Sequence, residues 1–385
     1  MSAERYQVVI VGAGLVGAAT ALALGRQGLR VALVERTPPV LSDATWDTRI
    51  YAISPSSQRF LTGIGAWQHL DLARVQPVTR MDVAGDTTGT LRLDAYASGT
   101  SHLATIVESG RLQHALWQAI AADGSVDVQC PAAISTLDRD GNDTYLTLAD
   151  GRTLVTQLVV GADGAHSRIR DWAGLAATVT PYGQHGVVAN FDCERPHRGT
   201  AFQWFFEGDI LAWLPLPGTR MSMVWSTASA QADRLLSLDS AALCARVRDA
   251  GHARLGELGL LTLAAAFPLN LLKVDVAVAP GVALIGDAAH GVHPLAGQGV
   301  NLGFGDAEAL VAVLVAHRRT RCGDLRVLQS YARARAEPVA RMQALTHGLH
   351  HLFADARASR VRNGGMSLLD RMSPLKAALI REAMA

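Results

Sequence analysis

Glycines recur at a narrow spacing near the start of the chain, at Gly12, Gly14 and Gly17, and Glu35 follows after the next apolar run. In this arrangement the first glycine permits a tight turn, the second lets a phosphate approach the backbone, and the third lets a helix pack closely on a strand. A carboxylate at Glu35 can accept hydrogen bonds from ribose hydroxyls and would repel a 2′-phosphate. The pattern therefore predicts a site for the ADP half of FAD or NAD rather than for NADP.

Two later clusters combine glycine with aspartate. Asp163 lies in the sequence GADGAHS, which a surface turn alone could also explain. Asp287 lies in GDAAH, where its position at the end of a strand suits a ribityl hydroxyl. The glycines of the following AGQGVN, Gly297 and Gly299, precede a helix whose free N–H groups can stabilise negative charge on a reduced flavin.

Apolar runs indicate which elements hold these clusters. Residues 7–11 form a strand-like run, residues 15–28 have helical spacing, and residues 30–35 form a second strand-like run. Strand, turn, helix and strand in this order are the βαβ unit of a doubly wound α/β sheet. The third cluster is placed in the same way, between a β run at 282–285 and a helix that starts near Val300.

The middle and the end of the chain have other patterns. Short alternating runs predict an antiparallel excursion from the sheet at residues 126–129, 144–148 and 153–160. Residues 179–272 are richer in aromatic side chains and in alternation, and they predict a separate β-rich lobe. Residues 326–385 predict mainly helices, with a break at Asn363-Gly364-Gly365.

Composition limits the class of protein. The chain has 385 residues, of which 49% are hydrophobic, so it can bury a sizeable core. The formal net charge of +1 gives no overall attraction to nucleic acid, and the four dispersed cysteines suit neither a metal site nor a disulfide framework. Because we find neither an uninterrupted membrane-length apolar run nor an export signal, we expect a cytoplasmic protein.

The three clusters, in this order and spacing, resemble the FAD-dependent aromatic hydroxylases of the para-hydroxybenzoate hydroxylase fold. Within that class, the segment from His293 to Asp306 resembles the signature of the ubiquinone-biosynthesis hydroxylases. Asp47-Thr48-Arg49 and Val107-Glu108 are supporting matches, so the resemblance extends over essentially the whole chain. It implies an α/β protein with a Rossmann-like FAD-binding domain, an interleaved β-rich substrate domain and C-terminal helices.

The resemblance also implies domain boundaries and roles for individual residues. The FAD-binding domain would cover 1–75, 101–178 and 275–325, the β-rich substrate domain 76–100 and 179–274, and the C-terminal helical segment 326–385. The ADP half of FAD would be bound by Gly12, Gly14, Gly17, Glu35 and Arg36. The pyrophosphate and ribityl region would be bound by Arg49, Gln113, Asp163 and Asp287, and the isoalloxazine would be supported by Gly297, Gly299, Val300 and Asn301.

The implied reaction is hydroxylation of a polyprenyl phenol or quinol of ubiquinone biosynthesis. Reduced FAD would react with dioxygen to give a C4a-hydroperoxide that attacks the ring, so no catalytic side chain is required. A single Rossmann fingerprint fits enzymes that meet NADH, NADPH or another electron donor transiently. Three rivals stay open: a soluble aromatic-acid hydroxylase, with Arg220 or Arg234 binding the substrate carboxylate, a flavin-dependent prenyl reductase, and a non-catalytic flavin-binding subunit of a biosynthetic complex.

Other residues allow two interpretations each. His290 and His293 could relay a proton from the phenol, although helix capping or packing is favoured. Four aromatic residues could line the substrate pocket, although such residues in a sheet more often form its core; they are Phe202, Trp204, Trp213 and Trp225. Residues 316–385 carry 13 lysines or arginines against 5 acidic residues. This basic segment could be a solvated face, or a peripheral surface that meets anionic lipid on the inner face of the membrane and other ubiquinone-biosynthesis proteins.

Overall fold

The glycine-rich turn joins two neighbouring strands of a parallel sheet, as the sequence predicts. The computed structural model describes residues 4–41, 45–206, 208–293, 297–354, 359–372 and 376. Strand β1 (Glu4–Val11) leads into helix α1 (Leu15–Arg26) and strand β2 (Val31–Val34), and the two strands pair in parallel. Every residue of β2 is buried, because helices and loops cover both faces of a parallel sheet.

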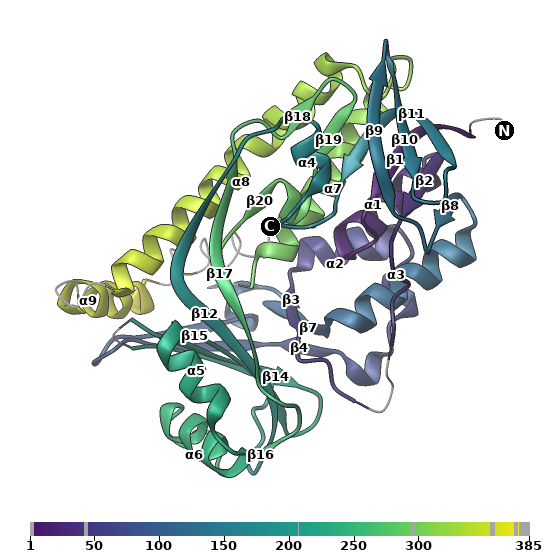
Figure 1. Cartoon of the computed structure of the whole chain (residues 1–385). Helices are drawn as coiled ribbons and strands as arrows, with labels where there is room; N and C mark the ends of the chain where they lie inside the picture. The colour runs from purple at the N-terminus through teal and green to yellow at the C-terminus, as the bar shows by residue number, and fades with distance from the viewer. Residues whose placement is uncertain are drawn as a thin grey trace.

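The parallel sheet has the strand order β18-β19-β11-β1-β2-β8, with β10 and β9 attached to β11 (Figure 1). Its remaining strands are β8 (Val126–Gln129), β9 (Ile134–Asp140), β10 (Asp143–Leu148), β11 (Thr153–Gly161), β18 (Val278–Ala279) and β19 (Val282–Leu284). The prediction of an antiparallel excursion is wrong for β8, which pairs in parallel with β2, and for β11, which pairs in parallel with β1 and β19 and is antiparallel only to β10. A helix precedes β8 and returns the chain in the parallel direction. Only β9 and β10 run antiparallel to their neighbours in this part of the described chain, apart from the short β18.

Helices pack on this sheet. They are α2 (Pro55–Gly63), α3 (Ser109–Asp123), α4 (Arg168–Trp172), α7 (Gly299–Ala316) and α8 (Leu325–Ala354). The short 3-10 helices are η1 (Trp67–His69), η2 (Leu72–Arg74), η3 (Tyr96–Ser98) and η4 (Gly286–Ala288). Among the described residues, α7 alone is long and apolar enough to cross a membrane, with a mean hydropathy of 1.5. It nevertheless packs between α1 and α8, where its apolar side chains form part of the core.

A second, larger sheet forms the β-rich lobe and has the order β20-β17-β12-β15-β14-β13-β5-β6, with β16 beside β12. Its strands are β5 (Arg80–Ala84), β6 (Thr90–Asp94), β12 (Ala177–Cys193), β13 (Thr200–Phe205), β14 (Ile210–Leu216), β15 (Arg220–Ala228), β16 (Leu258–Leu260), β17 (Ala265–Val274) and β20 (His290–Gly291). Helices α5 (Ser229–Ser237) and α6 (Ser240–Ala250) pack on one face of this large sheet. Figure 1 shows the long strands β12 and β17 running from the large sheet toward the parallel one.

A small sheet lies between the two lobes and consists of β3 (Ile50–Ile53), β7 (Ala104–Glu108) and β4 (Gln76–Val78). Its side chains pack against Leu214 and Ala201 of the large sheet. The segment 76–100 is therefore divided, since β4 pairs with β7 while β5 and β6 extend the large sheet. The domain boundaries as such remain a prediction.

The C-terminal segment is helical, but the predicted break at Asn363-Gly364-Gly365 is wrong. Helix α8 ends at Ala354, and α9 (Ser359–Arg371) continues through all three residues. Asn363 explains the difference, because its side chain bonds the Ser359 carbonyl at 2.7 Å and the Gly89 amide at 2.9 Å, so tertiary contacts override local propensity. Of the predicted basic segment, residues 355–358, 373–375 and 377–385 lie outside the described residues.

Candidate active site

The glycines of the first cluster have different surroundings. A Cβ atom added at Gly12, whose φ is +100°, would lie 2.4 Å from the Ala162 carbonyl oxygen, and one at Gly17 would lie 1.9 Å from the Gly12 oxygen. A Cβ added at Gly14 would meet nothing within 4 Å. Gly12 and Gly17 are therefore required by packing, whereas Gly14 borders open space at the N-terminus of α1.

The peptide groups of Ala13 are held from both sides. Glu35 Oε2 accepts from the Ala13 N–H at 2.7 Å, and the Ala13 carbonyl accepts from Gln113 Nε2 at 3.1 Å and from Trp117 Nε1 at 3.2 Å. Helix α3 thus brings the predicted Gln113 to the glycine turn, together with Trp117, which the sequence analysis missed although it lies one helical turn further on. Arg36 is exposed beside Glu35, and its backbone N–H donates to that carboxylate at 2.7 Å.

Asp163 lies next to the glycine turn, but its carboxylate binds protein groups. It accepts hydrogen bonds from the backbone N–H groups of Arg168 at 2.8 Å and Ile169 at 3.2 Å, and also from Ser167 Oγ. These bonds satisfy the free N–H groups at the start of α4. In the described structure Asp163 therefore holds α4 against the glycine turn.

The third cluster brings Asp287 close to Arg49. Asp287 is exposed in η4, yet enough protein surrounds its carboxyl group that desolvation is the largest influence on its pKa, which is raised. The charge of Arg49 opposes this shift. Burial raises the pKa of Tyr51 as well, and there the charge of Arg49 lowers the pKa while that of Asp287 raises it. The three side chains therefore lie near one another, and the region around them, which we call the recess, is the predicted site of the ribityl chain.

A buried ion-pair network holds η4 on helix α7. Asp306 is 1% exposed and pairs with Arg335 Nε at 2.7 Å and with His290 Nε2 at 2.6 Å, while it also accepts the Gly286 N–H at 2.9 Å. Burial raises the pKa of Asp306, but its bonds to His290 and Arg335 outweigh this and hold the pKa below its usual value. His290 is thus engaged in packing η4 on α7, the interpretation favoured from the sequence. His293 is buried against Tyr182, with ring centroids 4.9 Å apart.

The start of α7 is joined to strand β3. Gly297, with a φ of +60°, lies against Ala52, and α7 begins at Gly299. Val300 and Asn301 are buried, and Asn301 donates to the Ala52 carbonyl at 2.8 Å and accepts from the Ser54 N–H at 2.9 Å. The Asn301 side chain therefore binds protein, so support of a flavin from this helix would come from backbone N–H groups.

The four aromatic residues proposed for the pocket belong to the core under α5 and α6. Phe202 stacks on Trp204, and Trp204 meets Trp213 edge to face at 4.8 Å. All of them cluster with side chains of α5 and α6. The opposite side of the large sheet, which we call the substrate face, has small residues in register, including Val188, Val224 and Ala212.

Sequence comparisons identify the family. Residues 5–346 match the family described as FAD binding domain. The Escherichia coli (strain K12) protein named 3-demethoxyubiquinol 3-hydroxylase is 37% identical over 317 residues, which cover 82% of this chain and 81% of that protein. The Rhodospirillum rubrum ubiquinone hydroxylase UbiL is 34% identical over 389 residues, which cover 100% of this chain and 90% of that protein. The chain belongs to the family of FAD-dependent ubiquinone-biosynthesis hydroxylases.

A solved structure supports the same assignment for this hydroxylase. PqsL, described as a probable FAD-dependent monooxygenase from Pseudomonas aeruginosa, superimposes with a TM-score of 0.80 at 25% identity, covering 94% of this chain and 99% of that one. The predictions of an FAD-dependent monooxygenase and of the para-hydroxybenzoate hydroxylase fold are confirmed. The predicted contacts of individual residues with FAD stay predictions.

The glycine turn of the hydroxylase fits the pyrophosphate of FAD. Gly14 is the N-cap of α1 and supplies no capping side chain, so the first N–H groups of the helix are available to an anion. The open space beside Gly14 lies where the phosphates would have to approach.

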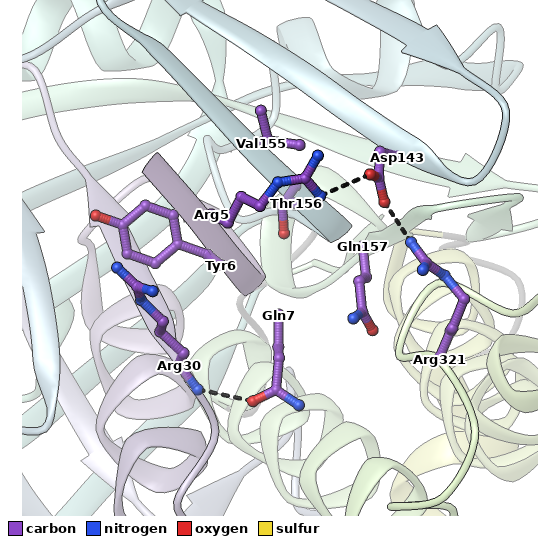
Figure 2. Close-up of a pocket in the computed structure, with 9 residues that line it drawn as sticks. All are labelled: Arg5, Tyr6, Gln7, Arg30, Asp143, Val155, Thr156, Gln157 and Arg321. Carbon is purple, nitrogen blue, oxygen red and sulfur yellow. Dashed lines mark hydrogen bonds and ion pairs between the residues drawn. The ribbon is translucent and has the colours of Figure 1, made fainter. Parts of the chain in front are cut away.

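The cavity in Figure 2 is a different place on the hydroxylase. It has a volume of about 190 Å³ and lies at the amino-terminal ends of β1 and β11, whereas the glycine turn follows the carboxyl end of β1. Arg5 and Arg321 both pair with Asp143 across its rim, which fixes the β9–β10 turn. The cavity is therefore separate from the cofactor motifs.

Replacing Asp287 with alanine is expected to weaken FAD binding and to raise the thermal stability of the FAD-free hydroxylase at neutral pH. Since the pKa of this carboxyl is raised in the folded protein, its ionised form disfavours folding above that pKa. The gain in Tm should disappear below pH ~4, where the carboxyl is protonated in both states. Thermal unfolding from about pH 3 to 8 and fluorescence titration with FAD measure the two effects. The exposed Asp275→Ala is the control, and unchanged FAD affinity in Asp287→Ala would refute the assignment of the third cluster.

Proposed function

We propose that this hydroxylase acts on the aromatic ring of a polyprenyl phenol or quinol intermediate of ubiquinone biosynthesis. The names of its relatives support the proposal, and the substrate face is the structural observation that carries it. Val188, Val224 and Ala212 lie side by side on this face, and the last two are only half-buried. Small apolar side chains suit a ring with an apolar tail and keep water from the reacting atoms.

The alternative of an aromatic-acid substrate is less well supported, because the two cations considered for its carboxylate are engaged or misplaced. Arg220 pairs with Asp192 at 3.1 Å and lies over the Trp46 ring. Arg234 is exposed on α5, a helix that covers the opposite face of the large sheet. A substrate without a carboxylate fits these positions better.

The residues of the recess suggest how the chain would hold FAD. Gly14 and the start of α1 would bind the pyrophosphate, Glu35 the ribose, and Asp287 a ribityl hydroxyl, while Arg49 would offset the charge of Asp287. Gln113 and Trp117 would act indirectly, because both hold the Ala13 carbonyl in place. When bound, reduced FAD supplies the electrons that activate dioxygen, so that one oxygen atom is transferred to the ring and the other leaves as water.

Mass analysis of the product tests the proposed substrate. Purified FAD-loaded protein would be mixed with a short-chain prenylated phenol in the presence of dioxygen. The electrons would come from NADH or NADPH, or from photoreduction of the flavin. We expect a product heavier by one oxygen atom, labelled from ¹⁸O₂. A product with a saturated tail would indicate a prenyl reductase. Hydroxylation of 4-hydroxybenzoate but not of the prenylated phenol would indicate an aromatic-acid hydroxylase. If no electron donor supports turnover, the protein is a non-catalytic flavin-binding subunit.

We further propose that the protein is cytoplasmic and binds peripherally to the inner face of the membrane, where polyprenyl substrates reside. On α9, Leu368 is 61% exposed, and Met372, just after the helix, is 43% exposed; Lys376 follows, half-buried and paired with Asp370 at 3.1 Å. Exposed apolar side chains next to cations suit an anionic lipid surface or other ubiquinone-biosynthesis proteins.

The double variant Leu368→Asp and Met372→Asp is expected to bind anionic liposomes at least about tenfold more weakly than the wild type. Each substitution removes an apolar side chain worth roughly 1.5–3 kcal/mol on burial and adds a charge that anionic lipid repels. Co-sedimentation at low salt measures the effect. Leu263→Asp, at another site that is 83% exposed, is the control. If the wild type does not sediment, the membrane proposal is wrong.

A further inference from the structure

Two buried polar side chains face each other in the large sheet without complete hydrogen bonding. Asn190 of β12 lies opposite Ser222 of β15, and both are 0% exposed. Among the residues that the structure describes, Asn190 Oδ1 and Ser222 Oγ have no hydrogen-bond partner. Because unpaired buried polar atoms disfavour folding, two of them side by side indicate a partner from outside the chain.

Both residues belong to the substrate face. Side chains alternate along a strand, so Asn190 points to the same side as Val188, and Ser222 to the same side as Val224. Ser222 is also in register with Leu214, a half-buried residue that packs with Ile50 of β3. The pair therefore lies where the substrate face meets the strand that follows Arg49.

Asn190 also holds the backbone that carries Arg49. Its Nδ2 donates to the Asp47 carbonyl at 2.8 Å. This bond crosses from the large sheet to the rest of the molecule, which contains the parallel sheet and the glycine turn and which we call the cofactor half. The Asp47 carboxylate in turn accepts the N–H groups of Arg49 and Gly110, each at 2.9 Å. Since Arg49 acts on the charge of Asp287, these bonds connect the substrate face to the recess proposed for FAD.

The other side of this backbone segment is fixed by a buried carboxylate. Glu108, 2% exposed, accepts from the Asp47 N–H at 2.8 Å and from Arg74 Nη2 at 2.7 Å. The Arg74 guanidinium lies 3.7 Å from the centre of the Trp46 ring. Asp47 is therefore held from two sides, by Glu108 at its N–H and by Asn190 at its carbonyl.

We propose that Asn190 is a positioning residue whose Oδ1, with Ser222 Oγ beside it, binds a hydroxyl group of the substrate ring, and whose Nδ2 transmits ring binding to Asp47 and Arg49. The inference rests on the proposed function and names the groups that recognise the oxygen substituent of a phenol. Asn190 Oδ1 accepts from the ring hydroxyl, and the Ser222 hydroxyl donates to its oxygen. The Asp47 segment covers Asn190, so the ring reaches this pair as that segment shifts, which links ring binding to Arg49.

The FAD-loaded variants Ser222→Ala and Asn190→Asp test this role with a short-chain prenylated phenol. Binding is followed by equilibrium dialysis, and the environment of FAD by its visible difference spectrum. We expect Ser222→Ala to bind the phenol about tenfold more weakly, the loss of one hydrogen bond, without a lower Tm, because it removes an unpaired hydroxyl. Asn190→Asp keeps an acceptor but loses the donor to Asp47. At saturating phenol it should therefore lose at least about half of the spectral response.

Thr227→Val is the control, since Thr227 is buried on the same strand but points to the opposite face, where it donates to Asp209 Oδ1 at 2.7 Å. It should bind the phenol as the wild type does. Wild-type affinity in Ser222→Ala, or a full spectral response in Asn190→Asp, would overturn the inference and leave the proposed function standing. A wild-type enzyme that binds FAD but does not bind the phenol would overturn both. A lower Tm with unchanged phenol affinity would show a purely structural pair.

Discussion

Replacing Gly14 with valine is expected to abolish FAD binding while the apoprotein remains folded. The φ of Gly14 is −65°, a value that any residue can adopt, and an added Cβ meets no protein atom within 4 Å. The same side chain would occupy the space through which a pyrophosphate reaches the start of α1. We expect FAD affinity to fall at least about 100-fold, or roughly 2.7 kcal/mol, with the Tm of the FAD-free protein within about 2 °C of the wild type.

The visible spectrum of the purified protein and fluorescence titration with FAD measure this effect. Gly17→Ala is the informative comparison, because its Cβ would lie 1.9 Å from the Gly12 oxygen and should destabilise the fold itself. The two variants thus separate a cofactor contact from a packing contact within one turn. A yellow, FAD-replete Gly14→Val protein would contradict the placement of the pyrophosphate.

Asp306→Asn is expected to lower the free energy of unfolding of the FAD-free protein by about 3–5 kcal/mol at pH 7, the range for breaking a buried ion pair. The substitution removes the negative charge between Arg335 and His290 and weakens the bond to the Gly286 N–H. Because η4 is held on α7 by this network, FAD binding through Asp287 should weaken as well. Urea unfolding followed by circular dichroism measures the stability.

The effect of Asp306→Asn should depend on pH in a defined direction. Since the pKa of Asp306 is lowered by its partners, its stabilising contribution is complete above the unfolded pKa of ~3.9 and is lost as pH falls through the folded value. The difference in the free energy of unfolding between the wild type and Asp306→Asn should therefore become smaller below pH ~4. Glu308→Gln, exposed on the same helix, is the control. A difference that is constant with pH would show that ionisation of Asp306 is not its source.

The parts of the site that follow one strand and one helix could be predicted from the sequence. The glycine turn, Glu35 and the strand before Asp287 depend on residues close together in the chain, where spacing determines geometry. The convergence of Arg49 and Asp287 could be expected only through the family resemblance. Nothing in either segment indicates that Arg49, just before β3, comes near Asp287 in η4.

The substrate face could not be predicted because its signal is weak. Trp204 and Trp213 stand out in the sequence, but they fill the core under α5 and α6. The residues that face the cofactor half are the alternate ones, such as Ala212, and small residues give no chemical indication of a pocket. Choosing between the two faces of a strand requires knowing which face the helices cover.

Long-range polar contacts could not be predicted from the sequence either. The break predicted at Asn363 ignored a hydrogen bond to Gly89, far away in the sequence. In the same way, Glu108 was noted only as a family match, whereas the structure shows it bonded to Arg74 and Asp47. Such contacts depend on the assembled fold and have no local pattern.

The interleaving of the two lobes has a consequence for biosynthesis. Strand β11 ends at Gly161, but its parallel neighbour β19 begins only at Val282, and α7, which covers α1, ends at Ala316. At the usual rates of translation, the ribosome needs on the order of ten seconds to pass from the end of β11 to the end of α7. During that time the edge of β11 is unpaired and the apolar surface of α1 is uncovered, so the nascent chain is exposed to aggregation. The cofactor half can therefore close only after the ribosome has made the whole substrate lobe.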